Sequence, residues 1–386
     1  MLLSLTNVPR DYSWGSPTLL AGLEGRAPSG APEAEVWFGD HPGDPADVAG
    51  GGTLDAVTGG TLPYLLKLLA AGGPLSIQVH PTIDQARDGW AREAGLAPDD
   101  PHRNYRDDNH KPELIVALTE RFEALSGLRP VAETLRMLDA LGDARGVASL
   151  RARLDGTGDV LRGAIGWLLA DATQGEVDEI IAATRTAAHA GAGEWEPVLR
   201  AVVGVADAFP GDPGVVVALL MNHVVLRRGE GIFLRAGLLH AYLGGLGVEI
   251  MAASDNVLRG GLTPKHIDVP ELLSILDTTT DAVPVLRPDS EGAITSYPVP
   301  IADFALRRVT LTGPPLTIDV AGPAMVLSTA GDVVVTGVDA VEHPVAIGAA
   351  VFASADEGSL QLTGTGEAFI ATPGALRPSP RPATRR

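Results

Sequence analysis

Hydrophobic and polar positions divide the chain into a β-rich first part, a helical middle and a β-rich last part. Residues 1–128 and 215–282 hold short apolar runs separated by Gly, Pro and Asp, a pattern typical of strands joined by turns. Apolar residues recur at helical spacing through residues 129–214. Residues 283–374 again show short β runs, and residues 375–386 have no pattern that could pack. The chain is therefore predicted to be mainly β with a helical insert, a C-terminal β unit and a disordered tail.

The segment LSIQVHP at 75–81 predicts a short strand. Side chains alternate between the two faces of a strand, so Gln78 and His80 share one face while apolar residues take the other. A solvent-exposed face or a hydrogen-bonded polar pair in a core would explain this placement. Half of a metal site would explain it as well.

A helix is expected directly after this strand, over residues 81–95. Thr82 is a candidate N-cap with Gln85 three residues later, and Gly95 is the expected end. Residues 96–112 then form a long polar loop.

Two apolar segments lie on either side of this region. Periodicity does not decide whether LPYLLKLLAA (62–71) is a helix or a buried strand. ELIVAL (113–118) predicts a short buried strand, and Glu113 at its start needs either solvent or a partner.

The segment 227–266 predicts a hairpin turn at RGEG (228–231), followed by strands interrupted at glycines. His240 and Tyr242 lie two residues apart and therefore face the same side, and Glu249 follows after a further glycine turn. A small β-barrel lines its interior with polar groups in this way. A hydrogen-bonded core histidine would also explain His240. Strands are expected to resume at about residue 215.

Composition narrows the possible chemistry. The 386 residues include no cysteine, so disulfides and thiolate sites are excluded and any metal must have nitrogen and oxygen ligands. The net charge of −19 argues against binding nucleic acid or anionic lipid. No basic leader and no apolar run long enough to span a bilayer occurs, so we expect a cytoplasmic protein without a membrane partner.

Four candidate metal ligands lie on three predicted strands: Gln78, His80, Glu113 and His240. Two histidines and a carboxylate form a common zinc set that leaves room for a substrate. Because glutamine is neutral, the ion would keep a net positive charge, which suits it to polarising a sugar oxygen.

The motifs QVHP (78–81), HKPE (110–113) and HAYL with GVEIMAASDNVLRGGLTPK (240–265) together resemble type I mannose-6-phosphate isomerases, also called phosphomannose isomerases, of the cupin superfamily. YSWGSPTLL (12–20) and PEAEVWFGDHP (32–42) are similar to that family's N-terminal motifs. The resemblance implies a cupin catalytic domain, a helical domain and a second jelly-roll domain. These domains correspond, in that order, to residues 1–128 with 215–282, residues 129–214 and residues 283–374.

The resemblance also implies the reaction, an interconversion of mannose 6-phosphate and fructose 6-phosphate through an enediol with one zinc ion per chain. It places the zinc ligands on the four residues above and the essential arginine on Arg259. Lys111, Glu249 and Asp255 match pocket positions, and the residues do not decide which of them is the base. The substrate-binding candidates are Ser76, Tyr242, Lys265 and Trp14.

Two other classes of function are compatible with a metal-binding cupin. One is another cupin enzyme, such as an iron dioxygenase or a cupin-type phosphoglucose isomerase. The other is a non-catalytic protein that binds a sugar phosphate. We expect a sugar phosphate as the partner and a monomeric chain, and the sequence leaves open whether mannose catabolism or GDP-mannose biosynthesis is served.

Overall fold

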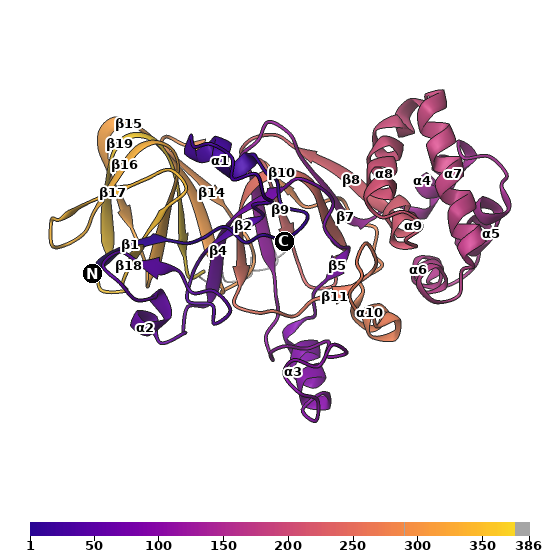
Figure 1. Ribbon diagram of the computed structural model, residues 1–386, viewed down its shortest axis with the longest axis horizontal. Helices are drawn as coiled ribbons and strands as arrows, with labels where there is room; N and C mark the ends of the chain where they lie inside the picture. Colours follow the sequence, from indigo (N-terminus) through magenta and orange to yellow (C-terminus); the bar gives the residue numbers. More distant parts are fainter. Residues whose placement is uncertain (289, 375–386) are drawn as a thin grey trace, which may run out of the picture.

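The computed structural model describes residues 1–288 and 290–374, so the predicted tail at 375–386 lies outside the described residues. The protein is mainly β, as predicted. A ten-stranded sheet lies between a nine-stranded sheet and a helical unit along the long axis of the molecule (Figure 1).

The ten-stranded sheet is organised around one long strand, β10 (His240–Ala252). Its first residues pair with β5 (Gln78–Val79) and β7 (Phe122–Leu128), and its later residues pair with β4 (Tyr64–Ala71) and β6 (Glu113–Ala117). A register shift at Tyr242/Gly244 separates the two halves. The sheet is completed by β2 (Glu35–Phe38), β8 (Met221–Leu226), β9 (Gly231–Leu234), β11 (Leu258–Arg259) and β12 (Val285–Leu286).

Two local predictions for this unit are wrong. The RGEG segment is not a hairpin turn, because β8 pairs with β7 whereas β9 pairs with β6 and β12. Glu249 does not follow a glycine turn, because β10 continues through Gly244, Gly245 and Gly247 without a break. The undecided segment 62–71 is the fully buried strand β4.

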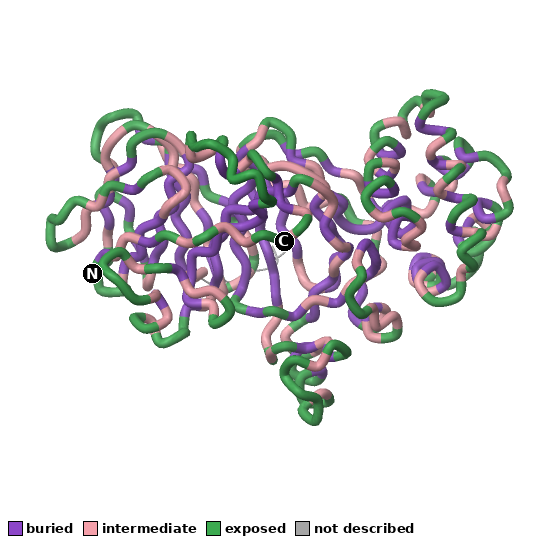
Figure 2. The backbone as a smooth tube through the Cα atoms, viewed as in Figure 1, coloured by how far each residue is buried: buried purple, intermediate pink, exposed green. Residues whose placement is uncertain are grey.

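The helix predicted after β5 is α3 (Ile83–Arg92), and its capping box between Thr82 and Gln85 is confirmed. The helix ends with Glu93 as its C-cap, before the expected Gly95. It projects away from the sheet, and most of its surface is exposed (Figures 1 and 2).

The helical unit has a continuous apolar core. Among the described residues, no helix is long and apolar enough to cross a membrane. The last helix of the helical unit, α9 (Gly214–Leu219), corrects the expectation that strands resume at about residue 215. All residues of α9 are buried, so packing in the helical core overrides the β propensity of its valines. The other helices are α4 (Val131–Asp139), α5 (Arg145–Leu154), α6 (Val160–Ala170), α7 (Gln174–Ala190), η1 (Gly193–Trp195) and α8 (Glu196–Ala208).

The nine-stranded sheet contains the C-terminal strands and two strands from the beginning of the chain. β1 (Leu2–Thr6) pairs with β18 and with β3 (Asp47–Val48), so these residues belong to this sheet rather than to the catalytic unit in which they were predicted. A shared apolar core that includes Phe38 and Phe369 joins the two sheets (Figure 2). The remaining strands are β13 (Ser290–Glu291), β14 (Ile294–Tyr297), β15 (Ala305–Asp319), β16 (Ala324–Thr336), β17 (Glu342–Val345), β18 (Ala350–Ala353) and β19 (Ser359–Thr372). Three short helices complete the fold: α1 (Leu19–Glu24), α2 (Leu54–Thr58) and α10 (Val269–Ile275).

Candidate metal centre and active site

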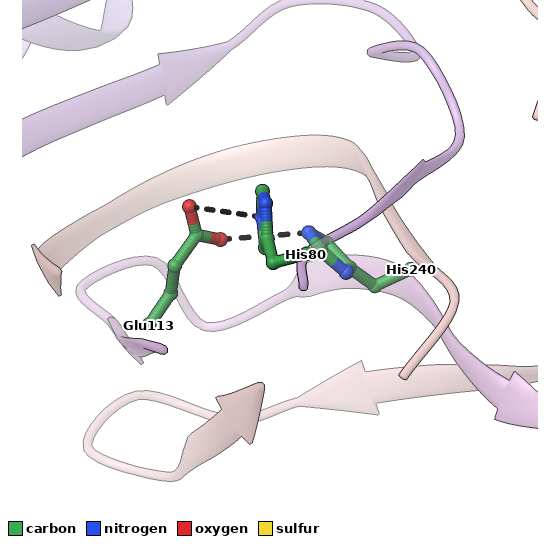
Figure 3. A group of neighbouring side chains, drawn as sticks. All are labelled: His80, Glu113 and His240. Carbon is green, nitrogen blue, oxygen red and sulfur yellow. Dashed lines mark ion pairs between the residues drawn. The ribbon is translucent and has the colours of Figure 1, made fainter. Parts of the chain in front are cut away.

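Three predicted metal ligands meet inside the ten-stranded sheet. His80 follows β5, Glu113 begins β6 and His240 begins β10, and one potential ligand atom from each lies within 4.8 Å of the others. Figure 3 shows the Glu113 carboxylate facing both imidazole rings, with His80 drawn between Glu113 and His240. Its oxygens lie 3.3 Å from His80 Nε2 and 3.4 Å from His240 Nε2. Ligand atoms about 2.1 Å from a tetrahedral zinc ion would be roughly 3.4 Å apart, so this spacing fits the ion.

The hydrogen bonds of the two histidines also fit a metal. His80 Nδ1 lies 2.7 Å from the backbone oxygen of Asn256, and His240 Nδ1 lies 3.0 Å from that of Leu238. Each Nδ1 therefore donates a proton to a carbonyl, so Nε2 is the ring nitrogen that each histidine can offer to a metal. Burial lowers the pKa of His80 to about 4, so its ring is neutral at pH 7. His80 Nε2 has no hydrogen-bond partner among the described residues although it faces a carboxylate, an arrangement that a bound cation would satisfy.

Gln78 lies beside this trio, since it pairs with His240 across the sheet. Its side-chain nitrogen donates to Ser76 Oγ at 3.1 Å, so the amide oxygen is the atom that it can offer to a metal. Arg259 pairs with Gln78 on the other side of β5. The register therefore places the predicted fourth ligand and the predicted arginine next to the metal ligands.

A cavity of about 500 Å³ opens beside the trio. All the predicted site residues except His80 line it, and His80 is fully buried. His240 and Tyr242 both line the cavity, as the alternation along the strand predicted. Glu249 lines it as well, although it lies an odd number of residues further along β10, beyond the register shift at Tyr242/Gly244. The predicted residues in its wall are Trp14, Ser76, Gln78, Lys111, Glu113, His240, Tyr242, Glu249, Asp255, Arg259 and Lys265.

A buried ionic cluster forms part of the wall. Lys67 Nζ lies 3.4 Å from Glu249 Oε2 and 3.7 Å from Glu35 Oε1, and Tyr242 donates to Glu249 Oε1 at 2.9 Å. Burial lowers the pKa of Lys67, but the two carboxylates outweigh it and hold that pKa above its usual value. One lysine cannot neutralise two carboxylates, and burial raises the pKa of Glu249 to about 7. Glu249 can therefore exchange a proton near neutral pH.

Two other cations of the cavity wall, Arg259 and Lys265, have a different environment. Neither Arg259 nor Lys265 forms an ion pair within the part of the chain that the structure describes, and both line the cavity. Burial and the neighbouring Arg106 guanidinium lower the pKa of Arg259. Burial, Arg259 and Arg106 likewise lower that of Lys265. Cations without acidic partners are suited to binding an anionic group.

Two further predicted residues have identifiable partners. Lys111 Nζ lies 3.2 Å from Glu113 Oε1. Asp255 Oδ2 lies 3.1 Å from His41 Nε2, and although burial raises the pKa of Asp255, this hydrogen bond brings it below its usual value. The ring of Trp14 stacks on Tyr12 at 5.7 Å between centroids, at the cavity wall.

Sequence reasoning did not identify several residues of the cavity wall, among them Lys67, Glu35 and Phe209. Lys67 had a signal, because a lysine inside the apolar run 62–71 must find partners if the run is buried. Its partner Glu35 accepts from Trp37 Nε1 at 2.7 Å. Phe209 lies at the end of α8 and brings the helical unit into the cavity wall, and no local pattern marked it.

Comparisons with known proteins give a consistent family. A family model described as phosphomannose isomerase type I, catalytic domain, matches residues 51–131. The mannose-6-phosphate isomerase of Escherichia coli is 36% identical over 357 residues, which covers 85% of this chain and 88% of the relative. That of Salmonella typhimurium is 35% identical over 387 residues, covering 94% and 97%.

Solved structures agree with these sequence relatives. A crystal structure of a histidine-to-alanine mutant of phosphomannose isomerase from Salmonella typhimurium has a TM-score of 0.88 and 32% identity, over 97% of this chain and 100% of that one. The structure of mannose 6-phosphate isomerase from the same organism, bound to fructose 6-phosphate and zinc, has a TM-score of 0.86 with the same coverage and identity.

Proposed function

The chain belongs to the type I phosphomannose isomerase family, and on that premise we propose that it is a zinc-dependent enzyme that interconverts mannose 6-phosphate and fructose 6-phosphate. The observation that carries the proposal is the trio of His80, Glu113 and His240, buried beside a cavity whose wall also holds cations that have no acidic partner among residues 1–288 and 290–374. The zinc-bound relative and its fructose 6-phosphate support the choice of metal and substrate.

Membership in this family also supports an assignment of the three structural units to domains. We propose that the ten-stranded sheet is the cupin catalytic domain, that the helices around residues 129–214 form the helical domain, and that the nine-stranded sheet is a second jelly roll. The nine-stranded sheet also includes β1 and β3 from the start of the chain, and the helical domain extends through α9 to Leu219.

Four residues would hold the zinc ion: His80, Glu113 and His240, with Gln78 through its amide oxygen. When bound, the ion supplies a Lewis acid that polarises the sugar oxygens at C1 and C2. With three neutral ligands and one carboxylate, the site keeps a net positive charge. Lys111 beside Glu113 adds an ammonium donor for developing negative charge on a substrate oxygen.

The proton transfer needs a base whose pKa lies near the working pH. We assign this role to Glu249, because it lines the cavity and burial raises its pKa to about 7. In the direction from mannose 6-phosphate, Glu249 takes the proton from C2 to give an enediol and returns it to C1. The hydroxyl proton passes from O2 to O1 in the same conversion, so atoms and charge balance.

The phosphate group requires cations that are not already neutralised. We propose that Arg259 and Lys265 bind it or stabilise the enediolate, because neither has an acidic partner among the described residues. Ser76, Tyr242, Asp255 and Trp14 complete the pocket as hydrogen-bonding and stacking groups. The local positive charge offsets the net charge of −19 for an anionic substrate.

The proposal is tested by mixing purified, zinc-loaded protein with mannose 6-phosphate in heavy water. Fructose 6-phosphate should form, and deuterium should enter at C1 where an enediol exchanges its proton with solvent. A His240→Ala variant should retain less zinc and convert substrate correspondingly slowly. Absence of conversion by zinc-loaded protein would refute the proposed activity, whatever the substrate affinity.

A further inference from the structure

The polar loop between α3 and β6 turns several of its groups toward the metal centre rather than toward solvent. The residue that connects this loop to the metal centre is Asn256, which is fully buried and hydrogen-bonds both to the loop and to His80. Asn256 lies between Asp255 and Arg259, both in the cavity wall, yet it does not line the cavity itself. A buried amide in this position requires an explanation.

Both ends of the Asn256 side chain are bonded to the loop. Its Nδ2 donates to the backbone oxygens of Asp107 and Asn109, each at 2.8 Å, and to Asp107 Oδ1 at 3.1 Å. Its Oδ1 accepts from the backbone N–H of Arg106 at 2.7 Å. With donors and acceptor all in use, the amide has one orientation, and the backbone of Asn256 is held with it.

That backbone is what His80 contacts. The carbonyl oxygen of Asn256 accepts from His80 Nδ1 at 2.7 Å, in a place where both groups are buried. This bond sets the tautomer of His80 and turns Nε2 toward Glu113, 3.3 Å away. The loop thus reaches the metal ligand through two hydrogen bonds in series.

The carboxylate of Asp107 holds the same segment from a second direction. Its Oδ2 accepts from the backbone N–H of Asp255 at 2.7 Å, and its Oδ1 accepts from Ser254 Oγ at 2.8 Å. Ser254 is buried, and its Oγ in turn accepts from the backbone N–H of Asn256 at 3.2 Å. One carboxylate therefore fixes three consecutive residues, the last of which fixes His80.

We propose that Asp107 and Asn256 are positioning residues that set the zinc affinity of the site by holding His80 in its ligating tautomer and orientation. Neither residue touches the metal or the substrate cavity. The inference rests on the proposed zinc site, in which His80 is a ligand. Outer hydrogen-bond partners of metal-bound histidines commonly contribute about 10- to 100-fold to metal affinity.

The test compares Asp107→Asn with Asp108→Asn. Both substitutions remove one negative charge from the same loop, but Asp108 is exposed. In Asp107→Asn an NH₂ donor replaces one acceptor oxygen, and it then faces either the N–H of Asp255 or the hydroxyl of Ser254. The zinc dissociation constant of each purified full-length variant is measured by competition with a chelator, and kcat is measured with excess zinc.

The expected result for Asp107→Asn is a dissociation constant raised about 10- to 100-fold, with most of kcat recovered in excess zinc. Asp108→Asn should bind zinc like the unaltered protein. Equal affinities in the two variants, whether both unchanged or both weakened, would overturn the inference. If the unaltered protein binds no zinc, the proposed function itself fails, and that outcome is visible before any variant is made.

A second variant covers the case in which Asp107→Asn does not fold. Ser254→Ala removes a hydrogen bond to the same carboxylate and leaves its charge in place. It should also weaken zinc binding relative to Asp108→Asn, while the visible spectrum of the cobalt-substituted protein shifts because the His80 ligand is less well held. An unchanged affinity and an unchanged cobalt spectrum would overturn the inference.

Discussion

Replacing Lys67 by methionine should destabilise the protein strongly, because Lys67 is the cation between two buried carboxylates. Its ammonium lies 3.4 Å from Glu249 and 3.7 Å from Glu35, and the side chains of all three are at most 8% exposed. Removing one partner of a buried ion pair costs about 3–5 kcal/mol, since the remaining charge is left without compensation. Lys67→Met should therefore lower the free energy of unfolding by about that amount at pH 8.

The loss in the free energy of unfolding should depend on pH, which distinguishes a missing charge from a general packing defect. Without Lys67, the folded-state pKa of Glu249, already raised to about 7 by burial, should lie still further above that of the unfolded chain. A carboxyl with a raised folded-state pKa favours folding at low pH, and this contribution is lost as the pH rises through that pKa. Between pH 6 and 8 the variant should lose about 1.4 kcal/mol per pH unit for each carboxyl that is protonated only in the folded state.

The measurement is urea unfolding of Lys67→Met and the unaltered protein at pH 5, 6, 7 and 8. Lys265→Met is the matched control, because it makes the same chemical change at an exposed residue and should cost no more than about 0.5 kcal/mol. The gap between Lys67→Met and the unaltered protein should widen with pH. A gap that is independent of pH, or no larger than the control's, would refute the assignment of Lys67 as the compensating charge.

Three other outcomes follow from the cavity. Arg259→Ala should lower kcat about 100- to 1000-fold in the isomerase assay while the zinc content stays normal, and a variant that keeps most of its turnover would remove Arg259 from the reaction. The pH profile of kcat/KM should fall on the acid side of about 7, where Glu249 becomes protonated, and Glu249→Gln should lose that limb along with most of the activity. In Gly214→Ala the new Cβ would lie 2.7 Å from the Cα of Gly261, so KM should rise as the turn that follows Arg259 moves. Gly204→Ala, with nothing within 4 Å of its new Cβ, should leave KM unchanged, and an equal KM in both variants would contradict this.

Local signals predicted local structure well. The capping box at Thr82 marked the start of α3, because both halves of the motif are close in sequence. The valines of α9 predict a strand, but burial in the helical core makes this segment a helix. The pairing of β1 with β18 joins residues such as Leu2 and Ala353, and no local pattern specifies a partner at that distance.

In the site, too, residues within short motifs were predictable, whereas residues that act through distant contacts were not. Gln78, His80, Glu113 and His240 were identified from motifs, and the structure brings the histidines and the glutamate together. The sequence predicts no more than a polar loop around Asp107, because the role of this residue depends on Asn256, which lies about 150 residues later in the chain. Such contacts are set by tertiary structure, so the residues that hold the ligands are harder to predict than the ligands.

The central claim is that bound zinc at the His80 site makes this chain a mannose 6-phosphate isomerase. Its most direct test is to strip the protein with a chelator and add zinc back in steps while following the conversion of mannose 6-phosphate to fructose 6-phosphate. Activity should vanish on chelation and return in proportion to bound zinc, reaching its limit at one ion per chain. Full activity in the metal-free protein, or a bound ion in every chain with no conversion, would contradict the claim.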